Sequence, residues 1–171
     1  ATPACARRAR LAVDLSCILL TWNSAAYVQA CLRSVFDDLE SSGLSHELIV
    51  IDNGSTDGTL QALAGLSRPS LTVIPLGHNT GTTFSRNIGL RMAGGEFVAI
   101  LDSDIEIRQR GSFSQLVQFM RDQPGVGIAA PQLHFPSGRY QKTVDDFPTL
   151  THKLRRFLHL GPGDSLARVE I

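Results

Sequence analysis

The chain has 171 residues, of which 43% are hydrophobic and 19% are charged. It is therefore long enough for a domain with its own core, and too apolar to be disordered throughout. Its 16 basic and 16 acidic residues cancel, which removes the sequence-wide argument for nucleic-acid binding, because that requires an excess of Lys and Arg. No apolar run approaches the roughly 18 residues of a membrane-spanning helix.

Cysteine usage and the first residues indicate the compartment. Cys5, Cys17 and Cys31 form no CxxC pair and cannot all pair with one another, so we expect small buried side chains in a reducing cytoplasm rather than a disulfide framework. The first ten residues are basic and small, without the apolar stretch of a signal peptide. We interpret 1–13 as a flexible leader.

Short apolar runs alternate with helical periodicities along the chain. We expect strands, in chain order, at Leu15–Thr21, Glu47–Asp52, Leu71–Pro75, Phe97–Leu101 and Val126–Ala130, then a small hairpin of Leu133–Phe135 and Arg139–Thr143. Helices are expected at Ala25–Ser41 with Ser24 as its cap, from Thr56 or Asp57 to Leu66, at Thr83–Ala93, at Ser112–Asp122 and at Leu150–Leu160. This alternation predicts an α/β fold, a mostly parallel sheet flanked by helices.

The predicted elements divide the chain into three parts: the leader, a domain over 14–148, and a basic amphipathic helix with a tail over 149–171. Leu150, Leu154 and Phe157 share one face of that helix, and Lys153 and Arg155 are polar-facing. One interpretation is that the apolar stripe docks on other parts of the protein and, if left uncovered, leads to self-association. The other is peripheral contact with a membrane surface.

Polar clusters lie at the ends of the first, second and fourth predicted strands and in the loop after the third strand. They are Thr21-Trp22-Asn23, Asp52-Asn53, Asn79-Thr80-Gly81 and Asp102-Ser103-Asp104. The carboxyl ends of parallel strands share one edge of the sheet, and ligands bind beyond that edge. We therefore expect these four clusters to converge on one binding crevice.

The cluster with the clearest chemistry is Asp102-Ser103-Asp104. Two carboxylates separated by one small residue can share a hard divalent cation such as Mg²⁺ or Mn²⁺, which prefers oxygen ligands. The alternative for the tripeptide is a helix cap or a solvated turn. Its position on the predicted binding edge favours the metal.

Three further side chains have a functional and an ordinary interpretation. Asp52 can accept hydrogen bonds from a base or a ribose, or can belong to a turn. Trp22 offers a flat face on which a base can stack, or is an ordinary aromatic residue buried in the core. Arg86 can bind a base carbonyl or a phosphate, although the sequence alone favours an ordinary surface arginine.

Several motifs of other enzyme classes are missing from the sequence. The first strand is not followed by GxGxxG, and there is no P-loop, HExxH or GxSxG. No His/Cys cluster has zinc spacing. A nucleotidyltransferase builds a similar sheet, but its glycine-rich GxGTR loop after the first strand is also missing.

Taken in order, the segments Leu19–Asn23 (LLTWN), Glu47–Thr59 (ELIVIDNGSTDGT), His78–Leu90 (HNTGTTFSRNIGL) and Glu96–Asp104 (EFVAILDSD) resemble the inverting family 2 glycosyltransferases, which have the GT-A fold. Gly125–Gln141 is similar to the segment after the metal motif in the rhamnosyltransferase-like branch. The resemblance extends over about residues 15–157.

The resemblance implies a nucleoside-diphosphate-sugar donor, UDP- or dTDP-linked, and roles for the cluster residues. Asp52 matches the aspartate that contacts the base, and Arg86 the arginine of an R-N-x-G segment near the nucleotide. Asp104 matches the more direct metal ligand, and Asp102 lies nearer the ribose or metal-bound water. Donor-binding positions implied in the same way are Thr21, Trp22, Asn23, Asn79 and Ser103.

An inverting enzyme also needs a general base to deprotonate the acceptor hydroxyl. In the family this base belongs to a downstream acidic motif, whereas the later pair Asp145-Asp146 lacks that context. We expect a donor-binding half whose base is missing from the chain and whose acceptor is a saccharide or a lipid-linked molecule. The alternative is a non-catalytic module that binds a nucleotide sugar or a protein partner.

Overall fold

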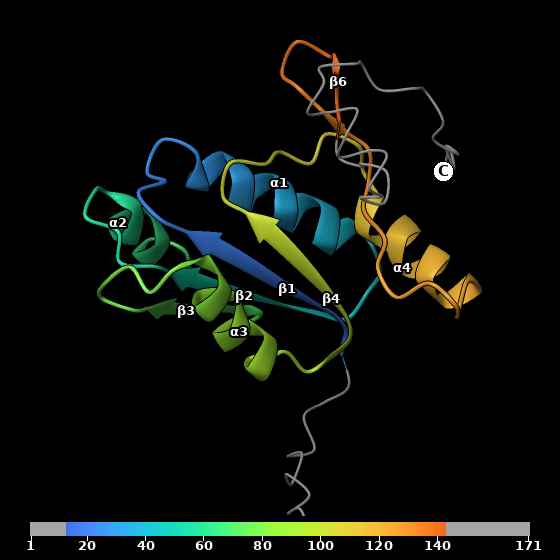
Figure 1. The fold of residues 1–171 in the computed structure, drawn as a ribbon, viewed down its shortest axis with the longest axis horizontal. Helices are drawn as coiled ribbons and strands as arrows, with labels where there is room; N and C mark the ends of the chain where they lie inside the picture. The colour runs from blue at the N-terminus through green and yellow to red at the C-terminus, as the bar shows by residue number, and fades with distance from the viewer. Residues whose placement is uncertain (1–12, 143–171) are drawn as a thin grey trace, which may run out of the picture. The chain divides into compact units, whose positions relative to one another are not determined.

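The computed structural model describes residues 13–142 and divides the chain into two compact units, 1–129 and 130–171 (Figure 1). The first contains a four-stranded parallel sheet of β1 (Val13–Thr21), β2 (His46–Asp52), β3 (Leu71–Pro75) and β4 (Gly95–Asp102), in the order β3-β2-β1-β4. The predicted helix Leu150–Leu160 lies outside the described residues. Within them, no helix is long and apolar enough to cross a bilayer.

The strand register brings the four carboxyl ends to one edge of the sheet. Thr21 on β1 is the partner of Asp52 on β2, and Asp52 is also the partner of Pro75 on β3. On the other side of β1, Leu20 pairs with Asp102 on β4. The polar residues at or just after these ends therefore meet, as the sequence predicts for parallel strands.

Successive residues of β1 and β2 point to opposite faces of the sheet, and each face has its own apolar cluster. On one face, Cys17, Leu19 and Val50 pack with α1 (Val28–Ser41), α2 (Thr59–Ala64) and α4 (Ser112–Asp122). On the other, Ile18 and Ile51 pack beneath α3 (Thr82–Met92). Helices thus flank both faces, which confirms the predicted α/β fold.

Strand β4, one of the two edge strands of the described sheet, differs from β1 and β2 because only one of its faces is covered. Phe97, Ala99 and Leu101 pack on the core, but Val98 and Ile100, which point to the other face, are 40% and 50% exposed. The sequence FVAIL suggests a buried strand, whereas here only one face of the strand is covered.

The predicted strand Val126–Ala130 is wrong. These residues form no strand and pair with no neighbour among residues 13–142, and Ile128 is 90% exposed. Gly127 within the run, and a proline on each side of it, weaken the extended pairing that an apolar run favours. The predicted hairpin is confirmed as β5 (Leu133–His134) and β6 (Tyr140–Gln141), which pair antiparallel.

Two predicted helix starts are also wrong. Helix α1 begins at Val28 without a side-chain cap, because Ser24 lies in a turn in which its carbonyl accepts from the backbone N–H groups of Tyr27 and Val28. Helix α2 begins at Thr59 and ends at Ala64. The hydroxyl of Ser24 contacts Ser103 in another loop instead. Asp57 accepts from the backbone N–H of Thr59, the first residue of α2, and also from that of Ala25 in the loop after β1.

One long-range contact fixes α4. Asp38 on α1 is 1% exposed, and its carboxylate accepts from the backbone N–H groups of Gly111, Ser112 and Phe113. These are orphan donors of a helix N-terminus, where negative charge is also favoured. A residue far away in the sequence thus replaces a local cap.

Candidate functional site

Asp52 is the centre of a hydrogen-bond network at the end of β2, and it is fully buried. One carboxylate oxygen accepts from the hydroxyl of Thr21, at 3.0 Å, and from the hydroxyl of Ser55. The other accepts from the backbone N–H of Ser55 at 3.0 Å. The network joins the ends of β1 and β2 and holds the turn that follows β2.

The loop after β1 is bound to the loop after β2. Asn23 has a positive φ of 48° and donates its backbone N–H to the hydroxyl of Ser55, at 2.9 Å. Its side-chain oxygen accepts from the backbone N–H of Thr56, also at 2.9 Å. Hydrogen bonds from Thr59 and from the backbone of Ala25 hold the pKa of the nearby Asp57 below its ordinary value.

The loop after β3 joins the same network through Asn53, which is 3% exposed. Its side-chain oxygen accepts from the backbone N–H of Thr80, at 2.8 Å, and from the hydroxyl of Ser85, at 2.8 Å. Its amide nitrogen donates to the side-chain oxygen of Asn79 at 3.0 Å. The sequence placed Asn53 in a polar cluster with Asp52, and in the structure this residue connects three segments.

Gly54 explains how the two loops approach so closely. It has a φ of 79°, and a Cβ there would lie 2.5 Å from the backbone of His78. A larger residue would therefore push the loop after β3 away from the loop after β2. The dipeptide Asn53-Gly54 is a turn signal in the sequence, but the close contact across the loops is visible only in the structure.

The predicted residues Trp22 and Ser103 have different environments. Trp22 is 55% exposed, so its ring is available for stacking rather than buried in the core. Ser103 is buried, and its hydroxyl lies 2.6 Å from the hydroxyl of Ser24. It joins the end of β4 to the loop after β1, so its part in the site is to hold these loops together.

Arg86 on α3 lies against the acidic motif. Its Nη2 donates to Oδ1 of Asp102 at 2.6 Å, and the two side chains are 33% and 59% exposed. The Nε of Arg86 is buried without a hydrogen-bond partner among residues 13–142. Asp104 is exposed, and its side chain makes no hydrogen bond or ion pair with another residue in this range.

The chemistry of this pair of carboxylates fits Mg²⁺ or Mn²⁺. Both side chains are accessible and supply only oxygen, the ligand type that these ions prefer. No group of three or more His, Cys, Asp or Glu residues among the described ones could hold an ion by itself. An ion bound by Asp104 and Asp102 would therefore complete its shell with water and ligand phosphate, which is usual for Mg²⁺.

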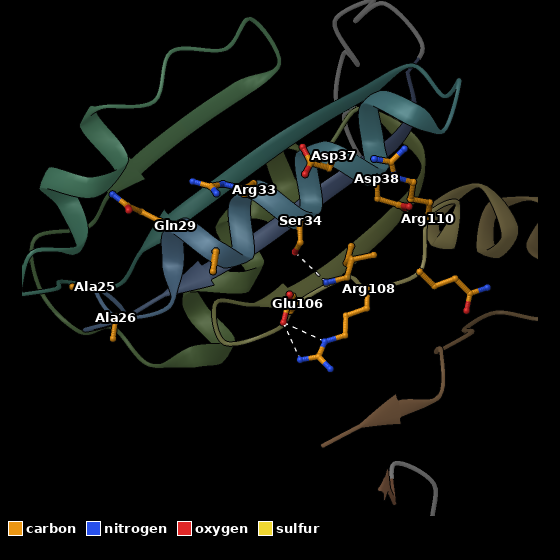
Figure 2. Close-up of a pocket in the computed structure, with 13 residues that line it drawn as sticks. Ala25, Ala26, Gln29, Arg33, Ser34, Asp37, Asp38, Glu106, Arg108 and Arg110 are labelled. Atoms are coloured by element: carbon orange, nitrogen blue, oxygen red, sulfur yellow. Dashed lines mark hydrogen bonds and ion pairs between the residues drawn. The ribbon is translucent and has the colours of Figure 1, made fainter. Parts of the chain in front are cut away.

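A second feature lies beside this edge, on the outer side of α1 (Figure 2). It is a polar pocket of about 540 Å³ between α1 and the segment 106–110. Ser34 holds the two walls together by accepting the backbone N–H of Ile107, at 3.0 Å. No residue predicted from the sequence to bind the donor lines this pocket.

The two described cysteines are structural. Cys17 and Cys31 are buried free thiols, as the sequence predicts. Burial raises the pKa of the Cys31 thiol to about 11 and also raises the pKa of the Cys17 thiol. Both therefore stay protonated at neutral pH and serve as small core residues.

The comparisons with known proteins identify the family to which this sheet edge belongs. The sequence profile described as "Glycosyl transferase family 2" matches residues 16–164. The chain belongs to this family.

Particular relatives are similar to parts of the chain. The succinoglycan biosynthesis protein ExoO of Rhizobium meliloti (strain 1021) is 32% identical over 95 residues, which are 56% of this chain and 26% of that protein. The mannosyltransferase PcManGT from Pyrobaculum calidifontis, solved in complex with GDP-Man and Mn²⁺, has a TM-score of 0.58 and 26% identity, over 64% of this chain and 32% of that one.

S. aureus TarS 1-349 in complex with UDP has a TM-score of 0.55 and 29% identity, and the match covers 70% of this chain and 38% of that one. These likenesses agree with the GT-A fold. In each case the chain spans less than two-fifths of the length of the protein that it matches.

Proposed function

We propose that this chain binds a nucleoside-diphosphate sugar at the carboxyl edge of its sheet, as the donor part of an enzyme that transfers the sugar to an acceptor with inversion. The observation that carries the proposal is the convergence of the four polar clusters, which hydrogen bonds between their loops hold together. Family membership supports the donor class, and the UDP and GDP-Man complexes of the similar structures support the ligand type.

The residues divide into two groups by their contacts. Asp52, Asn23 and Asn79 shape the nucleoside side of the site, because their hydrogen bonds hold the loops after β1, β2 and β3 together. Trp22 offers an exposed ring on which a base can stack. One oxygen of Asp52 accepts a single hydrogen bond, so it keeps the capacity to accept a second one from a base.

The second group is on the diphosphate side. Asp104 and Asp102 would hold Mg²⁺ or Mn²⁺, and Arg86 supplies a positive charge beside them. When bound, the ion supplies positive charge that stabilises the leaving diphosphate. Arg86 can add hydrogen bonds to the same phosphate oxygens.

The finer assignments also remain proposals: a UDP- or dTDP-linked donor, the rhamnosyltransferase-like branch, and a saccharide or lipid-linked acceptor. Membrane contact and self-association through the helix Leu150–Leu160 rest on residues outside the described part. The general base is not assigned. The pair Asp145-Asp146 also lies outside the described residues.

Calorimetric titration of the chain with UDP, dTDP and GDP, each with and without Mn²⁺, tests the proposal. We expect UDP or dTDP to bind more tightly with Mn²⁺, and Asp104→Ala to remove that dependence without loss of fold. Asp37→Ala removes an exposed carboxylate of α1 and is the matched control. A folded chain that binds none of the three nucleotides would contradict the proposal.

A further inference from the structure

The contact between Arg86 and Asp102 joins two side chains that the sequence assigned to separate ligand groups, one to the nucleotide and one to the metal. They come from different elements, α3 and β4, and lie 16 residues apart. In this structure the guanidinium of Arg86 and the carboxylate of Asp102 partly neutralise each other. Neither has another hydrogen-bond partner among residues 13–142.

Helix α3 is fixed against the sheet, which sets the position of Arg86. Ser85, its neighbour, is fully buried and donates to Asn53. Gly89 packs directly on β1, since a Cβ there would lie 2.5 Å from a methyl carbon of Ile18. The backbone of Arg86 therefore has little freedom, and its side chain must provide any movement.

The pair itself is weakly held. It rests on a single contact between partly exposed groups, an arrangement that contributes little stability and exchanges partners easily. The guanidinium is also imperfectly satisfied, because its buried Nε has no acceptor in the described residues, and an unpaired buried donor is costly. A better acceptor would therefore draw Arg86 away from Asp102.

A metal–diphosphate complex offers both partners a better counter-charge at once, the cation for Asp102 and the phosphate oxygens for Arg86. We propose that Arg86 is a positioning residue that holds Asp102 away from the metal in the empty site, and releases it when the diphosphate takes its place. This inference rests on the proposed donor binding and adds a coupling between the two ligands.

Under the proposal, removal of the arginine that pairs with Asp102 should improve metal binding. A cation alone must compete with Arg86 for Asp102, so Arg86→Gln should tighten the binding of Mn²⁺ alone. The diphosphate loses a favourable contact in the same variant, so UDP without metal should bind more weakly. Reciprocal coupling of this kind typically amounts to about fivefold or more.

Mn²⁺ titrations of the full chain, followed by electron paramagnetic resonance of the free ion, test this consequence. We expect Arg86→Gln to tighten Mn²⁺ about fivefold, and to change nothing in an Asp102→Asn background, because the competition is then already gone. Arg91→Gln removes a charge from the same helix and is the control for a simple field effect. Equal gains in both backgrounds, or none in either, would overturn the proposal.

A second readout follows the arginine directly by low-temperature NMR of its Nη2–H signal, since Nη2 is the nitrogen that donates to Asp102. In the empty protein this signal should be protected from exchange, and Asp102→Asn should remove the protection. UDP with Mg²⁺ should shift the signal as Arg86 changes partner. If UDP and Mg²⁺ bind while the signal stays unchanged, the positioning role is wrong although the proposed function stands.

If the signal is protected but the chain binds neither UDP nor a metal, the proposed function fails together with the positioning role, and only the ion pair remains. Arg86→Lys distinguishes charge from shape, because lysine keeps the charge but lacks the planar fork of donors. Under the proposal, Mn²⁺ binding by Arg86→Lys stays within about twofold of the wild type, since the competing charge is retained.

Discussion

The two sides of the sheet edge are built differently. On the side of β2 and β3, Asp52 and Asn53 are buried, and each accepts several hydrogen bonds. Gly54 lets the loop after β3 approach the loop after β2 closely. On the side of β4, Asp102 is exposed and has one partner, and Asp104 has no hydrogen bond to a described residue. The first side is preorganised, and the second is free to rearrange.

This difference suggests that the two sides of the proposed site bind different parts of the donor. Rigid loops suit a nucleoside, whose shape must be matched without an ordering cost on binding. Loosely held carboxylates suit a metal–diphosphate complex, which brings its own charge and completes its own coordination. The predictions below compare the two sides, starting with the largest expected effect.

The largest difference is expected in the unfolding free energy lost when a side chain beneath each side is truncated. Ile51→Ala removes a fully buried side chain from β2, and we expect a loss of about 2–5 kcal/mol of unfolding free energy. Ile100→Ala on β4 removes a side chain that is 50% exposed, so about 1 kcal/mol or less is expected. Denaturant unfolding measures both. Equal losses would show that Ile100 is covered in solution.

Substitution of the glycines tests the contact between the loops. Gly54→Ala combines a positive φ with a Cβ 2.5 Å from the backbone of His78, and should cost roughly 2–4 kcal/mol. Gly77→Ala is the matched control, since Gly77 has a φ of 74° but nothing within 4 Å of the added Cβ. It should cost only about 1–2 kcal/mol, the strain of the left-handed region. Thermal unfolding separates the two.

Substitution of the two aspartates should lower the stability to very different extents. Asp52→Asn places an amide nitrogen or a weaker acceptor against the donors of Thr21 and Ser55, and should cost about 2–3 kcal/mol of stability. Asp102→Asn breaks one exposed ion pair and should cost about 0.5 kcal/mol or less. Unfolding in the absence of ligand tests this pair. A large loss for Asp102→Asn would contradict the view that the β4 side is loosely held.

The smallest expected effect is the pH-dependent stabilisation by an ion pair at the amino ends of β1 and β4. Arg121 bridges Asp14 on β1 and Glu96 on β4. Hydrogen bonds from Ser45 and then Arg121 lower the pKa of Asp14 from 3.8 to about 2. Because the folded pKa is depressed, the stabilisation by Asp14 is present above about pH 4 and is lost as the pH falls from 4 to 2.

Denaturant unfolding of the wild type and of Asp14→Asn from pH 7 to pH 2 measures this contribution. The difference between the two should be constant above pH 5 and should shrink below pH 4. A difference that persists at pH 2 would mean that the effect comes from packing rather than from the charge.

Much of this arrangement follows from the sequence alone. Apolar runs that alternate with helical periodicity predict a parallel sheet, and parallel strands bring their carboxyl ends together whatever lies between them. That is why Thr21, Asp52, Asn79 and Asp102 could be placed on one edge, and why the order of the motifs indicated a family 2 glycosyltransferase. These are properties of local pattern and chain order.

The tertiary structure alone decided what each of these side chains does. The burial of Asp52, the cap that Asp38 gives to α4 and the pairing of Arg86 with Asp102 all depend on contacts between elements distant in sequence. The run Val126–Ala130 has the composition of a strand but no partner strand in the described residues, and β4 is apolar on both faces but covered on one. Composition gives a residue its preference, whereas burial and pairing depend on which neighbours the fold places beside it.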